Sequence, residues 1–206
     1  MKLETLLAHG LTAMGLELPA TAQAQLIAYL RLLEKWNRHY NLTAVRDPEQ
    51  MVGRHLLDSL SLLPFLHGPR VLDIGTGAGL PGIPLALARP ELRFTLLDSN
   101  VKKLTFVRQA LHELGLREVE IAQTRAEKFQ PTEKFDTLTA RAFSSLAELL
   151  AVATHLCAPG GRILAMKGVF PSAELEAVGA NYRIEVKALT VPGLDAQRHL
   201  VILEPR

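Results

Sequence analysis

The sequence has few cysteine and aromatic residues and no long apolar run. Of its 206 residues, 1 is cysteine and 1 is tryptophan, and aromatic residues make up 5%. The single cysteine, Cys157, cannot form an internal disulfide, which fits a reducing compartment, and we expect it to be a core residue. No apolar run approaches the ~18 residues of a membrane span, and the N-terminus lacks the pattern of a secretion signal. We therefore expect a cytoplasmic protein that does not contact a membrane.

Several catalytic motifs are also missing. The chain contains no H-E-x-x-H, no paired cysteines and no G-x-S-x-G, so metal hydrolysis and serine-type catalysis have no support, and we expect no metal. The formal net charge is +2, which excludes a uniformly basic surface but leaves room for a local basic patch that binds an anionic partner. Hydrophobic residues make up 48% and charged residues 21%, proportions typical of a folded core.

The pattern of apolar residues changes at His67-Gly68-Pro69. Before this point the apolar spacing is helical, and after it strands and helices alternate, which predicts an α/β fold with a mostly parallel sheet. We predict a helical region over residues 1–66 that packs on a core of residues 67–206. The expected helices are 2–14, 20–39, one starting at Asp47-Pro48, 81–88, 100–114, 144–156 and 171–178; the expected strands are 70–75, 93–98, 119–123, 135–140, 161–166, 183–190 and 199–203.

The most informative stretch is VLDIGTGAGLPGIP, Val71 to Pro84. A short apolar strand is followed by glycines at alternate positions, an arrangement that presents bare backbone N–H groups to a ligand; these are Gly75, Gly77 and Gly79. Asp98 ends the next predicted strand, 23 residues after Gly75, close to the ~20-residue offset at which an acid reaches ribose hydroxyls. Asp73 would repel a pyrophosphate and attract an ammonium group. Together these residues predict a nucleoside pocket for S-adenosylmethionine.

Two other functions fit parts of the same stretch. Gly77, Gly79 and Gly82 have the G-x-G-x-x-G spacing of a nicotinamide-dependent oxidoreductase. Asp73 is awkward for that enzyme, and 206 residues leave no second substrate domain. An RNA-binding or ribosome-assembly protein with a vestigial pocket is the other alternative, against which the intact Asp73, glycines and Asp98 argue.

Ligands of parallel sheets bind at the carboxyl ends of the strands, so the residues at those ends are candidates for the site. Thr124 to Glu127 follow the third predicted strand, Arg141 the fourth and Lys167 the fifth, and Arg198-His199 stand at the entry to the last. Three cationic positions around one nucleoside pocket favour an anionic or electron-rich substrate.

Several segments together resemble the RsmG family, also called GidB, which methylates N7 of one guanine in 16S ribosomal RNA. They are NLTAVRDPEQM (41–51), RHLLDSL (54–60), DIGTGAGLPGIPLA (73–86), LLDSNVKK (96–103), RAF (141–143), MKG (166–168) and DAQRHLV (195–201). The resemblance covers about residue 20 to the C-terminus and departs at Ala78, where many members have proline. It implies a class I S-adenosylmethionine-dependent methyltransferase, Rossmann-like with a mostly parallel seven-stranded sheet, preceded by an N-terminal helical extension.

The resemblance also implies roles for individual residues. The residues expected at the cofactor are Gly75, Leu80, Asp98, Ala126, Glu127 and Arg141, in addition to Asp73, Gly77 and Gly79 from the glycine stretch. The residues expected to face RNA are Arg54, His55, Lys167, Arg198 and His199. Arg141 and Lys167 are expected to position the reactants, and Arg141 could hold either the cofactor carboxylate or guanine O6.

The expected chemistry needs no general base, because guanine N7 has a free lone pair and no proton to lose. An enzyme for this reaction must align N7, the methyl carbon and sulfur, and stabilise the changing charge. The expected partner is 16S ribosomal RNA or the small ribosomal subunit, and the sequence leaves open whether naked RNA, an assembly intermediate or the mature subunit is the substrate. It does not fix the oligomeric state either, and we take a monomer as the expectation.

Overall fold

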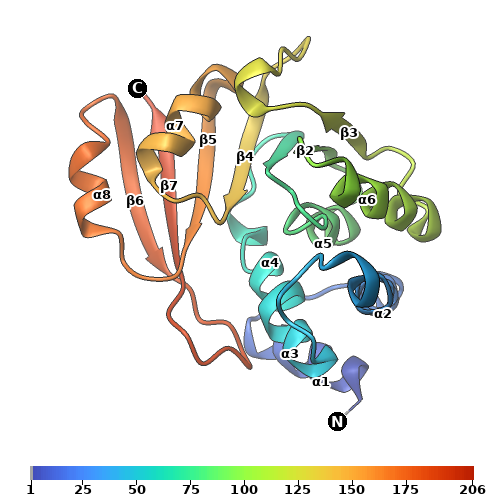
Figure 1. Cartoon of the computed structure of the whole chain (residues 1–206). Coiled ribbons are helices and arrows are strands. Elements are labelled where there is room, and N and C mark those ends of the chain that lie inside the picture. The colour runs from blue at the N-terminus through green and yellow to red at the C-terminus, as the bar shows by residue number, and fades with distance from the viewer. Residues whose placement is uncertain (1) are drawn as a thin grey trace.

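The computed structural model describes residues 2–206, so Met1, the first residue of the predicted helical region, lies outside the described part. A central sheet carries helices on both faces, and the N-terminal helices extend the layer on one of them (Figure 1). Within the described residues, no helix is long and apolar enough to cross a membrane.

The sheet has seven strands in the order β3-β2-β1-β4-β5-β7-β6. Its strands are β1 (Arg70–Ile74), β2 (Arg93–Asp98), β3 (Glu120–Gln123), β4 (Phe135–Arg141), β5 (Cys157–Lys167), β6 (Tyr182–Ala188) and β7 (His199–Pro205). Only β7 runs antiparallel to its neighbours, β5 and β6. The predicted α/β class with a mostly parallel seven-stranded sheet is confirmed, although β5 begins four residues earlier than the sequence predicted.

The helices match the predicted segments closely. They are α1 (Leu3–Ala13), α2 (Ala20–Tyr40), α3 (Pro48–Met51), the π-helical η1 (Val52–Leu57), α4 (Asp58–Leu60), η2 (Leu63–Phe65), α5 (Gly82–Ala88), α6 (Val101–Leu114), η3 (Ala126–Lys128), α7 (Leu146–Ala153), η4 (Thr154–Leu156) and α8 (Ser172–Ala177). Asp47 caps α3 as expected, its side chain accepting a hydrogen bond from the backbone N–H of Glu49 at 3.0 Å. No pattern in the sequence predicted the π-helix that follows α3.

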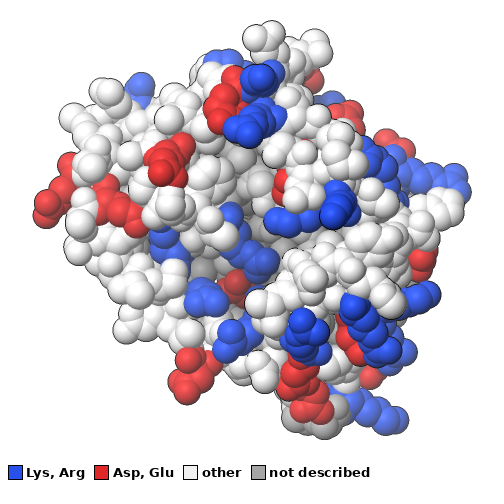
Figure 2. Space-filling view, in the orientation of Figure 1, with Lys and Arg blue, Asp and Glu red and all other residues white. Residues whose placement is uncertain are grey.

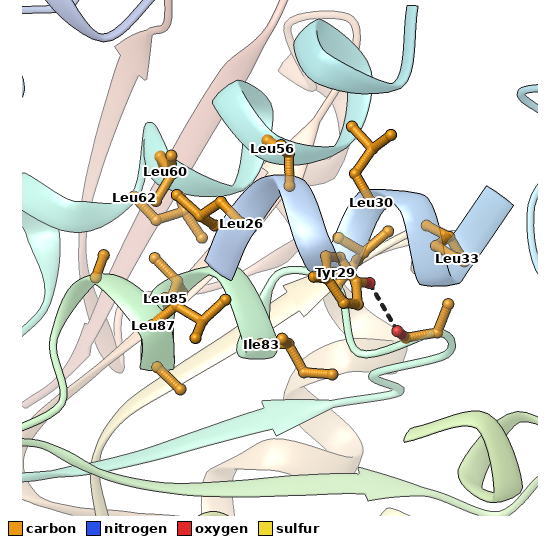
Figure 3. Packing of buried hydrophobic residues seen from close by; sticks show 14 of the residues in the cluster. Leu26, Tyr29, Leu30, Leu33, Leu56, Leu60, Leu62, Ile83, Leu85 and Leu87 are labelled. Carbon is orange, nitrogen blue, oxygen red and sulfur yellow. Dashed lines mark hydrogen bonds between the residues drawn. The ribbon is translucent and has the colours of Figure 1, made fainter. Parts of the chain in front are cut away.

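Alternating residues of the strands send apolar side chains to the two faces of the sheet. In β1, Val71 joins the cluster formed with α5 and α6, whereas Leu72 and Ile74 join the cluster formed with α7 and α8. The first cluster also contains the apolar faces of α1, α2 and the α3–α4 segment. Figure 3 shows Leu26, Leu60 and Leu62 on the side of the cluster that faces Leu85 and Leu87 of α5. The helical N-terminal segment and the sheet therefore share one apolar core, and the division between residues 66 and 67 stays a prediction.

A buried tyrosine links α2 to the loop that follows β1. Tyr29 is completely buried, and its hydroxyl donates a hydrogen bond of 2.8 Å to the carbonyl oxygen of Ala78 (Figure 3). Because this contact joins residues 49 positions apart, it fixes the loop against the helical layer.

We predict that Tyr29→Phe lowers the free energy of unfolding by about 1–2 kcal/mol, because the Ala78 carbonyl loses its buried partner. Urea unfolding measures the change. Tyr182→Phe is the matched control, since the Tyr182 hydroxyl bonds Thr154 at an exposed position and its loss should cost less than about 0.5 kcal/mol. Equal losses in the two variants would contradict a special role for the Tyr29 contact.

Candidate functional site

A cavity of about 230 Å³ opens at the carboxyl ends of the parallel strands. It is lined by Ile74, Gly75, Leu97, Asp98, Ser99, Thr124, Arg125, Ala126, Glu127, Phe143 and Val152. These residues lie at or just after the ends of β1, β2, β3 and β4, with one contribution from α7. The sequence predicted a site at this edge, and the structure brings four of the predicted cofactor residues, Gly75, Asp98, Ala126 and Glu127, to its walls.

The buried carboxylate of Asp73 holds the glycine loop from beneath. Its side chain accepts hydrogen bonds from the hydroxyl of Thr76 at 2.6 Å, the backbone N–H of Gly82 at 2.9 Å and the hydroxyl of Thr139 at 3.1 Å. Asp73 is 1% exposed, and burial raises the pKa of its carboxyl group while these hydrogen bonds oppose the increase. A Cβ at Gly82 would lie 2.8 Å from the carboxylate, so glycine is required where α5 begins.

The last residues of β2 also bind the glycine loop through hydrogen bonds. The carbonyl oxygen of Leu97 accepts from the N–H of Gly75 at 2.8 Å, and Asp98 accepts from the N–H of Gly77 at 2.9 Å and from that of Asn100 at 2.8 Å. Gly75 and Gly77 have φ values of 68° and 60°, which favour glycine. A Cβ on Gly75 would meet only the ring of Phe143, at 3.8 Å, so its bare backbone faces the cavity.

Other predicted cofactor residues lie outside the cavity wall. Asp73, Gly79 and Leu80 are buried behind the loop, and Arg141 ends β4 two residues before Phe143. Gly77 is half-buried and does not line the cavity either. The sequence reasoning did not assign Phe143 or Val152 to the site. The position of Phe143 just after a strand end was a signal that could have found it, whereas nothing in the local sequence marks Val152.

Arg141 and Arg198 share one buried acid. Arg198 Nε donates to Asp58 Oδ1 at 3.0 Å, and Arg141 Nη1 lies 3.6 Å from Asp58 Oδ2. Asp58 therefore pairs with two arginines that are distant in sequence, and not with His55, one helical turn before it. Ala142, which follows Arg141, has a φ of 65°, an unusual conformation for a residue other than glycine and one found at functional strand ends.

Lys167 lies at the end of β5 with its ammonium group turned inward. It donates to the carboxylate of Glu174 at 2.8 and 3.1 Å and lies 3.3 Å from the carbonyl oxygen of Phe143. Glu174 also accepts from the N–H of Leu146 at 2.6 Å. With only 10% of its side chain exposed, Lys167 ties α8 to the segment after β4, an arrangement that favours a positioning role over direct RNA contact.

His55 is the predicted RNA-facing residue that the structure does not favour. It is 6% exposed in η1, its Nε2 lies 2.9 Å from the hydroxyl of Thr43, and its Nδ1 has no hydrogen-bond partner among the described residues. Burial, followed by the charge of Arg141, lowers its pKa to about 4. A buried neutral ring cannot attract phosphate, so we correct this assignment.

Three other predicted RNA-facing residues, Arg54, Arg198 and His199, are exposed or half-buried. Lys167 pairs with His199 in the β5–β7 register, which places Arg198 and His199 beside the end of β5 as predicted. The His199 ring lies 5.6 Å from that of Phe170, which is 49% exposed, and Arg54 is exposed on η1. Figure 2 shows basic side chains gathered around a hollow near the centre of this face.

A larger cavity of about 460 Å³ lies at the opposite edge of the sheet, where β1, β2 and β4 begin. It contains none of the predicted site residues, and its Arg70 already pairs with Glu133 at 3.1 Å and Asp136 at 3.3 Å. Because ligands of parallel sheets bind at the carboxyl ends, we place the site at the smaller cavity. Residues 2–206 contain no group of three or more His, Cys, Asp or Glu side chains that could hold a metal ion.

The family model described as rRNA small subunit methyltransferase G matches residues 22–201. A relative with that name from Nitrosococcus oceani is 54% identical over 205 residues, covering 98% of this chain and 95% of the relative. The chain belongs to this family. Membership confirms the resemblance stated above and argues against the nicotinamide-dependent alternative.

Solved structures share the fold at low sequence identity. A putative O-methyltransferase from Klebsiella pneumoniae has a TM-score of 0.60 at 17% identity, covering 86% of this chain and 90% of that one. The O-methyltransferase NcsB1 of neocarzinostatin biosynthesis, solved with S-adenosylmethionine bound, has a TM-score of 0.56 at 16% identity, covering 67% of this chain and 49% of that one. The class I methyltransferase fold expected of the family is thereby confirmed.

The buried His55 predicts a pH dependence of stability. Its folded-state pKa of about 4 lies below the unfolded value near 6.5, so the stability that it contributes is present above pH ~6.5 and is lost as the pH falls toward 4. We predict that the free energy of unfolding falls in both proteins when the pH is lowered from 7.5 to 5. The fall should be about 2 kcal/mol larger in the parent than in His55→Gln. The control is His112→Gln at an exposed position, which should follow the parent. Identical pH profiles for the parent and His55→Gln would contradict this account of His55.

Proposed function

We propose that this chain transfers a methyl group from S-adenosylmethionine to N7 of one guanine in 16S ribosomal RNA, without a general base. Membership of the rRNA small subunit methyltransferase G family carries the proposal. The cavity at the strand ends and the S-adenosylmethionine bound to NcsB1, a protein of the same fold, support the choice of methyl donor. We expect the enzyme to act in the cytoplasm as a monomer.

The residues around the cavity fit a nucleoside. Ile74, Leu97 and Val152 offer apolar walls for a base, and the Asp98 carboxylate keeps lone pairs for ribose hydroxyls beyond the two N–H groups that it already accepts. Gly75 leaves bare backbone toward the cavity. We assign Asp73 an indirect role, because its buried carboxylate is already bonded to the loop that would cradle the cofactor.

Bound S-adenosylmethionine would supply an electrophilic methyl group on a sulfonium. The task of the chain is then to align the reactants and to supply donors where charge changes. We assign the Arg141 guanidinium to the cofactor carboxylate, the role that the family resemblance implies, in preference to guanine O6. We assign Lys167 to positioning, because its ammonium group fixes the Phe143 carbonyl and thereby the segment next to the cavity.

The RNA side of the site would use the exposed cationic rim. Arg198, His199 and Arg54 lie where a phosphate backbone could approach, and the target base must be unstacked to enter a pocket. The buried His55 is not available as a base, which supports direct attack by the N7 lone pair.

The product identifies the reaction. Small ribosomal subunits from cells that lack this enzyme would be incubated with it and labelled S-adenosylmethionine, and their 16S RNA digested to nucleosides for mass spectrometry. We expect the label in 7-methylguanosine, and a single-turnover rate without a unit slope between about pH 6 and 9, because no proton is removed before attack. Label in another nucleoside, or a clean unit slope, would contradict the proposal.

Two acids near the loop should differ in their effects. We predict that Asp98→Ala weakens S-adenosylmethionine binding by about 1–3 kcal/mol, the cost of losing a charged hydrogen-bond partner. Its loss of stability should be smaller than that of Asp73→Ala, because it removes two loop hydrogen bonds, one of them exposed. Asp73→Asn should change affinity by less than about threefold, because an amide can keep the loop bonds when the Thr139 hydroxyl accepts. Calorimetric titration and urea unfolding measure both variants.

Asp73→Ala serves as the structural reference, since it loses all three hydrogen bonds and should lower the free energy of unfolding by several times the ~1 kcal/mol of one bond. A folded Asp73→Asn that binds as weakly as Asp98→Ala would mean that Asp73 contacts the cofactor ammonium group directly, as the sequence first suggested.

A further inference from the structure

Asp58 joins three distant parts of the chain at the cationic end of the sheet. It lies in α4 of the helical layer, whereas Arg141 ends β4 and Arg198 precedes β7, 140 positions away in sequence. Each carboxylate oxygen faces one arginine, Oδ1 at 3.0 Å from Arg198 Nε and Oδ2 at 3.6 Å from Arg141 Nη1. The side chain of Asp58 is 3% exposed, so water does not compete for these contacts.

Arg141 and Arg198 are partly exposed to solvent, whereas Asp58 is buried. Their side chains are about one-quarter exposed, and each guanidinium has five N–H donors, of which Asp58 occupies only a few. One anion facing two cations leaves an excess positive charge at this partly exposed position, which suits an anionic ligand. Asp58 therefore fixes the direction of both arginines without using up their donors.

A contribution to the stability of the fold does not by itself explain a buried carboxylate at position 58. Removing a charge from water costs free energy, and replacing a buried ion pair with apolar residues of similar volume is often neutral or stabilising. Burial raises the pKa of the Asp58 carboxyl while both arginines oppose the increase. Asp58 is buried despite this cost, and its carboxylate contacts two arginines of the proposed site. Orienting these arginines explains the buried carboxylate better than joining the helical layer to the sheet does.

We propose that Asp58 is a positioning residue that sets the guanidinium of Arg141 toward the cofactor and that of Arg198 toward RNA. This inference rests on the proposed function for the roles of the arginines. It makes the N-terminal helical layer a contributor to the reaction, because α4 supplies the shared counter-ion.

The test compares Asp58→Asn with Glu204→Gln. Glu204 is a matched control, since it also faces two arginines, Arg162 at 3.0 Å and Arg183 at 3.9 Å, and lies toward the opposite end of the sheet. For Asp58→Asn we expect S-adenosylmethionine affinity to fall about threefold to tenfold and kcat at least about tenfold, because misdirected groups cost rate more than binding. Glu204→Gln should leave both within about twofold.

A double-variant cycle separates positioning from folding. If Asp58 acts through Arg141, the double variant Asp58→Asn/Arg141→Gln should bind S-adenosylmethionine less than about twofold more weakly than Arg141→Gln alone. If the two residues acted independently, the losses of affinity of the two single variants would multiply. The proposal is overturned if Asp58→Asn lowers the melting temperature but leaves cofactor affinity and kcat unchanged at a temperature where it is fully folded.

If Asp58→Asn does not fold, Asp58→Glu decides, because it keeps the charge and displaces both arginines by about one methylene. We expect kcat to fall at least about threefold in that variant, and an unchanged kcat would overturn the proposal. Cofactor affinity is measured without RNA, so its result does not depend on which atom of the RNA is methylated. A wrong N7 assignment would appear as a different methylated nucleoside in the product of the parent enzyme.

Discussion

The buried carboxylate of Asp73 is the contact on which the site depends. One side chain joins the end of β1 to Thr76 in the loop, to Gly82 at the start of α5 and to Thr139 in β4. Gly75 lines the cavity with bare backbone, and neither it nor Gly77 has a side chain with which to hold the conformation of the loop. The loop must be held from beneath, and an acid that accepts three hydrogen bonds can do so where an apolar residue could not.

The helical layer contributes to the same edge of the sheet. Tyr29 reaches the loop at Ala78, and Asp58 reaches Arg141 and Arg198. Gly53 permits a close approach, since a Cβ there would lie 3.2 Å from the carbonyl oxygens of Pro192 and Gly193 in the segment that leads to Arg198. The layer therefore belongs to the structure of the site as well as to the hydrophobic core.

The sequence predicted the sheet, the glycine loop and the strand ends because these depend on local patterns. Apolar alternation identifies β1, and glycines after a strand mark the loop that follows it. The direction in which a side chain points depends on contacts that the local pattern does not show. His55, expected to face RNA, is buried against Thr43, and Asp58 pairs with Arg198, 140 positions away in sequence. Lys167 likewise faces Glu174, a pairing that no spacing in the sequence reveals.

Hydrogen–deuterium exchange with and without S-adenosylmethionine would show whether the sheet and the helical layer build one site, because it reports every part of the chain at once. We predict slower exchange on binding in residues 75–80, 98–100 and 126–128, together with α4, which carries Asp58. Protection at the opposite edge, around Arg93 and Gln130, or a loop that becomes protected while α4 is unchanged, would contradict a single site built jointly by the sheet and the helical layer.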